Sequence, residues 1–201
     1  MSIAKWFVPI ACVAATLGAQ GINDVNGLVS AANHYVSSGM AASRDPQPLG
    51  LYKLLGNYSD QAPNTLMGKA SDVLHWTFLY KIDTTGQESL GPGDCPTAPA
   101  KPHVAVTAEC TKGVFHDFHY SDKPVTGLKS LENTWLAVNL DAAVATLNAN
   151  GYVRGFTSVS VERPDLANWP DDLVYVFNCP YERRQVGISC QTGALLWTYA
   201  F

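Results

Sequence analysis

A spaced pattern of valine, cysteine and glycine occurs twice in this chain. It spans residues 106–113 and residues 186–193, and both copies read Val-x-x-x-Cys-x-x-Gly with identical spacing. In each copy an apolar stretch precedes the glycine and an aromatic stretch follows it, which is typical of a strand, a turn and a returning strand. The recurrence predicts that one structural unit is made twice.

A predicted helix and a predicted apolar strand precede each copy. Residues 22–43 and 140–148 carry apolar side chains at helical spacing, and strands are predicted at residues 72–83 and 173–178. The predicted fold class is therefore α+β, a tandem repeat of a helix packed on an antiparallel β-sheet. Residues 49–55 are expected to form a short helical turn. Further strands are expected at residues 103–109, 114–120, 154–163, 184–190 and 194–201.

The N-terminus has the layout of a secretory signal peptide. Lys5 is the single cation before an apolar run over residues 6–18, and small residues follow the run. The run is shorter than the roughly 20 residues that a membrane-spanning helix needs. We expect a secreted, extracellular protein that has no membrane contact once this segment is removed. The expected parts of the chain are a signal peptide at 1–20, an N-terminal α+β half-repeat at 21–123 and a C-terminal half-repeat at 135–201.

Four cysteines remain after removal of the signal peptide, which is an even number in a chain expected to be extracellular. This count predicts two disulfides but leaves their connectivity open. The candidates are Cys95, Cys110, Cys179 and Cys190. Cys179 and Cys190 are expected at opposite ends of a hairpin, beyond the limit of about 7 Å between bonded α-carbons. A bond from Cys95 to Cys110, or bonds between the two halves, stay open.

Composition and charge exclude several classes of function. Apolar residues make up 47% of the chain and charged residues 15%, which is typical of a globular protein. The net charge is −4 and lysine and arginine form no run, so nucleic acid is not an expected partner. The sequon Asn57-Tyr58-Ser59 predicts a glycoprotein that carries a glycan on Asn57.

Two motifs characterise residues 139–201. The helix carries alanines from Ala142 and is closed by Gly151, and residues 186–195 read Val-Gly-Ile-Ser-Cys-Gln-Thr-Gly-Ala-Leu. This half resembles a PepSY domain, a module of metalloprotease propeptides and of free-standing secreted proteins, and the first half resembles a degenerate copy. The resemblance implies a domain that binds and restrains a protease. The ending has Ser189 and Cys190 where the family usually carries an aspartate. The doubled build is also similar to that of secreted β-lactamase-inhibitory proteins, in architecture only.

No catalytic set is recognisable in the sequence. The nucleophile elbow, the zinc-protease helix motif and the phosphate-binding loop are all missing. His116 and His119 lie three positions apart on an expected strand and would face opposite sides, so they would not share a metal without a bulge. We therefore expect no catalytic residue, no metal and no cofactor, and the sequence favours a protein that is not an enzyme.

Partner contacts are expected at a loop and at a turn. Trp169 stands in a polar loop, and Tyr181, Glu182 and Arg183 form the tip of a hairpin. Exposed aromatic side chains are typical anchors of protein interfaces. The sequence thus predicts a secreted, non-catalytic module that binds a protein or peptide. The PepSY resemblance implies the more specific prediction, a protease inhibitor or regulator.

Two alternatives stay open. The first is a secreted structural or surface protein that self-assembles through its sheet edges. The second is a small-molecule binder or an enzyme that uses a cleft between the halves, with His116, His119 or Asp117 near the cleft.

Overall fold

The computed structural model describes residues 24–43, 48–59, 61–82, 104–131, 135–165 and 171–201. Within these ranges the chain forms an open antiparallel β-sheet and two α-helices, which is an α+β fold as expected. The helices are α1 (Val25–Ser43) and α2 (Leu140–Ala149). The strands are β1 (Pro48–Asn57), β2 (His75–Ile82), β3 (Ala105–Thr111), β4 (Val114–Ser121), β5 (Ser158–Glu162), β6 (Val174–Cys179), β7 (Arg184–Ser189) and β8 (Leu195–Ala200). A 3-10 turn, η1 (Ala70–Asp72), lies between β1 and β2.

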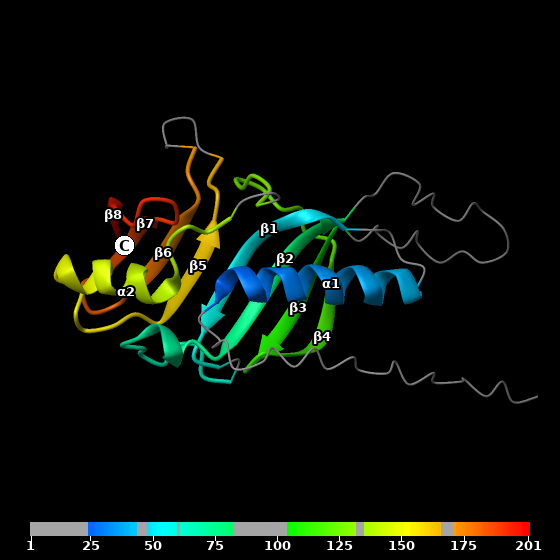
Figure 1. Cartoon of the computed structure of the whole chain (residues 1–201), viewed down its shortest axis with the longest axis horizontal. Helices are drawn as coiled ribbons and strands as arrows, with labels where there is room; N and C mark the ends of the chain where they lie inside the picture. Colours follow the sequence, from blue (N-terminus) through cyan, green and yellow to red (C-terminus); the bar gives the residue numbers. More distant parts are fainter. Residues whose placement is uncertain (1–23, 44–47, 60, 83–103, 132–134, 166–170) are drawn as a thin grey trace, which may run out of the picture.

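The sheet has the strand order β4-β3-β2-β1-β5-β6-β7-β8, and every neighbouring pair is antiparallel. Along the chain, a helix and four strands are followed by a second helix and four more strands. Each set of four strands is a meander in which consecutive strands pair. The two meanders meet where β1 lies beside β5, and we call this pairing the seam (Figure 1).

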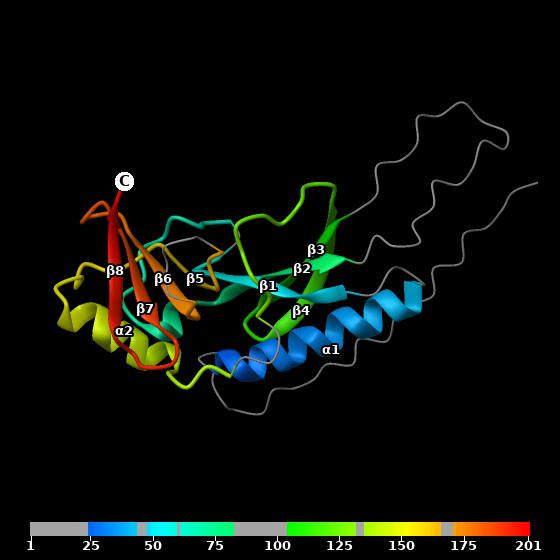
Figure 2. The same cartoon turned by 90° about the horizontal axis from the view of Figure 1, so that it is seen from above.

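Both helices cover the same face of the sheet. Figure 2 shows α1 below the first meander and α2 below the second, with the strands above them. We call this side the helix face and the opposite side the open face. The side chains of Trp76, Phe78 and Tyr80 lie on the helix face, whereas those of His75 and Thr77 alternate with them onto the open face.

Capping residues set the ends of the helices. The Asp24 carboxylate accepts a hydrogen bond from the amide of Gly27 (3.1 Å) at the start of α1. Asn139 does the same for the amide of Ala142 (2.9 Å) at the start of α2. Gly151 follows α2 with a φ of +93°, a backbone conformation that favours glycine. The end of α2 before Gly151 is confirmed as the sequence predicted.

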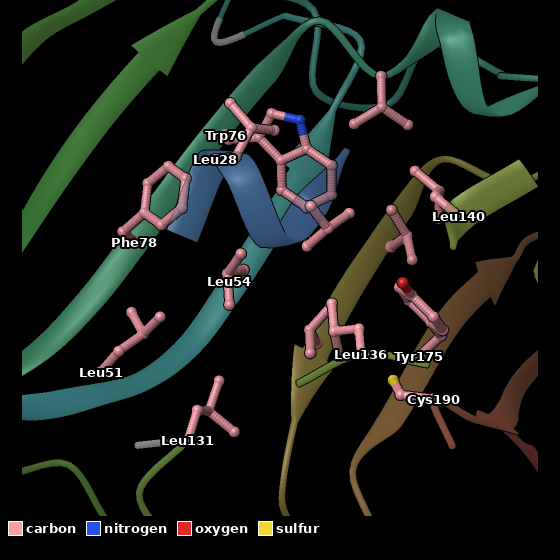
Figure 3. Close-up of a cluster of buried hydrophobic side chains, with 14 of the residues drawn as sticks. Leu28, Leu51, Leu54, Trp76, Phe78, Leu131, Leu136, Leu140, Tyr175 and Cys190 are labelled. Carbon is pink, nitrogen blue, oxygen red and sulfur yellow. The ribbon is translucent and has the colours of Figure 1, made fainter. Parts of the chain in front are cut away.

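The hydrophobic core continues across the seam. Leu54 of β1 stands between Phe78 of β2 and Val161 of β5 in the register, and all three side chains are buried. Figure 3 shows that the cluster extends from Leu28 and Phe78 on one side of the seam to Tyr175 on the other. The two meanders therefore share one core.

A close approach at the seam requires glycine. A β-carbon at Gly56 would lie 2.6 Å from Cγ1 of Val73 and 2.9 Å from the indole of Trp76. Trp76 is fully buried and opposes Gly56 in the register. The missing side chain at Gly56 thus makes room for the largest residue of the core.

The expectation of a helical turn at residues 49–55 is wrong, because these residues form most of the central strand β1. Short apolar runs do not distinguish a strand from a helical segment by periodicity alone. The run pairs with β2 on one side and β5 on the other, and this long-range pairing decides the conformation. Pro48 begins the strand, a position that a proline tolerates.

The expected signal peptide lies outside the described residues. Among the helices that are described, none is both long and apolar enough to cross a membrane.

Shortening Leu54 tests the shared core. We expect Leu54→Ala to lower the free energy of unfolding by about 2–5 kcal/mol, since the cavity opens between the two meanders. Leu49→Ala is the matched control on the same strand, because Leu49 is 47% exposed, and it should cost less than about 0.5 kcal/mol. Urea unfolding monitored by tryptophan fluorescence measures both; equal effects of the two substitutions would contradict a core at the seam.

Candidate functional site

The β6–β7 turn and the end of β8 lie together at one end of the sheet. Tyr181 and Arg183 of the turn are exposed, and Arg183 has a φ of +50°. The amide of Phe201 donates a hydrogen bond to the carbonyl oxygen of Arg183 (3.2 Å). The structure therefore brings two predicted contact residues beside the C-terminal strand.

β8 is an edge strand. Among the described residues it pairs with β7 alone, and the other edge of the sheet is β4. In an antiparallel strand the backbone groups of successive residues point to alternate sides. The backbone amide of Phe201 points to β7, so the backbone N–H and C=O groups of Tyr199, two residues earlier, also point to β7. The backbone N–H and C=O groups of Thr198 and Ala200 therefore point away from the sheet. These outward groups are available for pairing with another strand.

Large aromatic side chains surround this edge. Tyr181 is 62% exposed, Tyr199 62% and Phe201 60%, so each presents most of its ring to solvent. Tyr199 and Phe201 come from β8 and its end, and Tyr181 comes from the adjacent turn. This clustering distinguishes the end of the sheet from an isolated exposed aromatic residue. We call Tyr181, Thr198, Tyr199, Ala200 and Phe201 the β8 edge site.

Arginines accompany the edge site. The guanidinium of Arg154 stands over the Tyr181 ring, 5.7 Å from its centroid, and Arg183 and Arg184 are exposed at the same turn. Glu182 is half-buried, and its Oε2 has no hydrogen-bond partner among the described residues. The accessible charge here is therefore positive, although the chain as a whole carries −4.

Two contacts hold β8 against β7. The indole of Trp197 lies on Gly187, where any β-carbon would overlap the ring. The buried Ser189 hydroxyl donates to Oδ2 of Asp172 (2.7 Å) and accepts from the amides of Gln191 and Thr192 (3.2 and 3.1 Å). Ser189 thus organises the β7–β8 turn together with Asp172, which comes just before β6.

Two predicted site residues lie elsewhere. Trp169 is outside the described residues. Asn57 is the half-buried last residue of β1, between His75 of β2 and Ser158 of β5, and its glycosylation stays a prediction.

A groove of about 610 Å³ opens between α1 and the sheet. Its walls include Asn33 of α1 and Tyr80 of β2, whose side chains hydrogen-bond to each other (2.9 Å). The residues that line this groove do not include His116, His119 or Asp117, and the expected cleft between the halves stays a prediction. α1 closes the groove from the helix face, whereas the β3–β4 register places Asp117 and His119 on the open face, opposite Glu109 and Thr107.

A bulge changes the histidine geometry that the sequence predicted. The register shifts between Glu109 and Cys110, so Glu109 opposes Asp117 while Cys110 opposes Phe115, and His116 is the extra residue. This bulge brings His116 near His75, with their ring centroids 6.3 Å apart. His75, Glu109 and His116 form one group whose chemistry could hold a metal ion, and Glu109, Asp117 and His119 form another.

No disulfide joins the described cysteines: Cys110, Cys179 and Cys190 are free and buried, and a bond from Cys95 stays a prediction. Cys179 and Cys190 lie at opposite ends of the β6–β7 hairpin, roughly 20 Å apart at about 3.3 Å per residue. Cys110 on β3 is four strands away from β6, which is about 19 Å. These separations exceed the bonding limit, and Cys95 lies outside the described residues.

Comparison of this chain with protein-family models, with curated proteins and with solved structures finds no match.

The sequence did not predict that the β8 backbone has outward groups at a sheet edge. It also did not predict that His75 and Glu109 lie close to His116. The edge position of β8 depends on strand order, which no local pattern encodes. Glu109 could have been found, because the two-residue turn at Lys112-Gly113 places it near His116 across a hairpin.

Burial should make the cysteines unreactive. It raises the pKa of the Cys110 thiol to about 11 and that of Cys179 to about 12, and it raises the pKa of Cys190 as well. At neutral pH these groups are therefore uncharged thiols rather than reactive thiolates. We expect iodoacetamide to label them only after unfolding, as measured by peptide mass mapping; fast labelling of Cys179 in the native protein would contradict its placement.

Proposed function

We propose that this protein is a secreted, non-catalytic binding module that captures an extended segment of another protein along β8. The observation that carries the proposal is the β8 edge site, where outward backbone groups and three exposed aromatic rings share one end of the sheet. Strand addition uses such an edge: backbone hydrogen bonds provide affinity, and alternate side chains provide specificity.

The charge at the edge indicates the kind of segment. Arg154 stands over the Tyr181 ring, and Arg183 and Arg184 are exposed at the same turn, so acidic side chains in the partner gain favourable contacts there. The rings of Tyr199 and Phe201 suit apolar side chains at alternating positions. The partner segment is thus extended, with apolar and acidic residues in alternation.

The proposal includes a doubled, PepSY-like architecture. A helix followed by four strands occurs twice in the chain, and strand order is mirrored about the seam. The repeated motif gives further support: Cys110 and Cys190 are both buried, and Gly113 and Gly193 have φ values of +81° and +73°. On this basis the proposed partner class is a secreted protease, which the module inhibits or regulates.

Blocking the outward backbone of β8 tests strand addition. A random 12-residue peptide library selected on the full chain should yield segments that alternate apolar and acidic residues. We expect Thr198→Pro to weaken the selected peptides at least about tenfold, because proline removes an outward donor. This substitution leaves the backbone hydrogen bonds between β7 and β8 in place, and the side-chain bond from Arg184 to the Thr198 hydroxyl is lost equally in the valine control. Fluorescence anisotropy with labelled peptide measures the affinity.

Thr198→Val is the matched control, since it keeps the amide and should bind within about twofold of the unchanged chain. Equal binding by the proline and valine variants would contradict strand addition. Sedimentation of the unchanged chain separates the self-assembling alternative: a dimer that Thr198→Pro dissociates would mean that β8 pairs with a second copy.

Inhibition of a protease is a separate expectation. Added in stoichiometric amounts, the chain should reduce cleavage of a peptide substrate by a thermolysin-type metalloprotease, and Thr198→Pro should reduce it less. Unchanged cleavage at a large excess of the chain would contradict the proposal that the partner is a protease. It would not contradict the proposal that β8 binds an extended segment.

A further inference from the structure

Three histidines and two carboxylates lie together on the open face near β4, which is the edge of the sheet opposite β8. They come from β2, β3 and β4 and comprise His75, Glu109, His116, Asp117 and His119. One ligand atom from each of His75, Glu109 and His116 lies within 4.8 Å of the other two. His75 is almost fully buried, with 3% of its surface exposed, so the group reaches below the surface.

The hydrogen bonds around His116 fix which of its nitrogens carries the proton. Nδ1 of His116 lies 2.7 Å from Oδ2 of Asp117, and a carboxylate only accepts, so Nδ1–H donates. In the neutral ring Nε2 then carries a lone pair. The Thr111 hydroxyl lies 2.9 Å from this Nε2 and donates its single hydrogen to it.

The same reasoning extends to His75. Oγ1 of Thr111 has donated its hydrogen to His116, so it accepts from Nδ1–H of His75 at 3.0 Å. Nε2 of the neutral His75 ring therefore carries a lone pair. It faces Oε2 of Glu109 at 3.9 Å, too far for a hydrogen bond. A lone pair of a buried imidazole and a carboxylate oxygen of a half-buried glutamate thus lie 3.9 Å apart without a hydrogen bond, and a cation between them is favourable.

We propose that this cation is a divalent transition metal of the zinc type, held by Nε2 of His75, Nε2 of His116 and the carboxylate of Glu109. Two imidazoles and one carboxylate are a donor set that zinc uses where one position stays open. Two ligands of a tetrahedral zinc with bonds of about 2.0–2.2 Å lie roughly 3.4 Å apart. The 3.9 Å between His75 and Glu109 is close to that separation.

The surrounding groups orient these ligands. Asp117 accepts from Nδ1–H of His116, and Thr111 accepts from Nδ1–H of His75, so Nε2 is the basic nitrogen of each neutral ring. A metal bound to His116 takes the place of the hydrogen that the Thr111 hydroxyl donates to its Nε2. Nε2 of His119 lies 3.3 Å from Oε1 of Glu109 and holds the oxygen that does not face His75. Solvent, or a donor from a partner, reaches the fourth position, because His116 and Asp117 are exposed.

Zinc titration of the full, tag-free chain against a chromogenic chelator tests the site. We expect one equivalent of zinc to bind, and His116→Ala to weaken binding more than about 100-fold because a ligand is lost. Asp117→Asn should weaken it about 10–100-fold, since it removes only the group that orients His116. Cobalt in place of zinc should give the visible absorption of a four- or five-coordinate site in the unchanged chain and lose it in His116→Ala.

His34→Ala is the matched control, because His34 is exposed on α1, away from the site, and its removal should leave zinc affinity unchanged. His116 is used rather than His75 because loss of a buried ring could prevent folding, and circular dichroism checks each variant. Equal zinc affinity of the unchanged chain and His116→Ala would overturn the proposal. A loss in His119→Ala as large as in His116→Ala would also overturn it, since the metal would then lie with Glu109, Asp117 and His119.

Discussion

The antiparallel pairing of β1 with β5 is the interaction on which the rest of the structure depends. Five residue pairs, from Lys53 with Glu162 to Asn57 with Ser158, turn two four-stranded meanders into one sheet. Because Leu54 and Val161 oppose each other there, the apolar layers under α1 and α2 become one core. A salt bridge of 2.6 Å between Lys53 and Glu162 spans the same seam.

The local parts of the fold were predictable from the sequence, and the long-range pairing was not. The caps of α2, the strand β2 and the turn at Lys112-Gly113 follow from patterns within a few residues. β1 was misread because its apolar run is ambiguous until both neighbouring strands are present. The separation of Cys110 from Cys179 was also not predictable, because it depends on strand order alone. The hairpin tip at Tyr181 was predicted as a contact, but the edge beside it required the topology.

The seam also separates the two candidate sites. With β1 and β5 at the centre, β8 and β4 become the two edges, at opposite ends of the sheet. The β8 edge site offers backbone groups, aromatic rings and arginines, which suits an extended segment with acidic side chains. The β4 end offers imidazoles and carboxylates that face one another across a bulge, which suits a metal ion. Neither site shares a residue with the other.

Amide hydrogen exchange of the native protein tests the central claim, that the seam makes the two meanders one cooperative unit. The amides that bond β1 to β5 should be among the slowest to exchange, at the rate of global unfolding and together with those of β2 and β6. Amides of β8 should exchange faster, because that strand pairs on one side only. Faster exchange at β1 and β5 than within either meander would contradict the account, since the halves would then open independently.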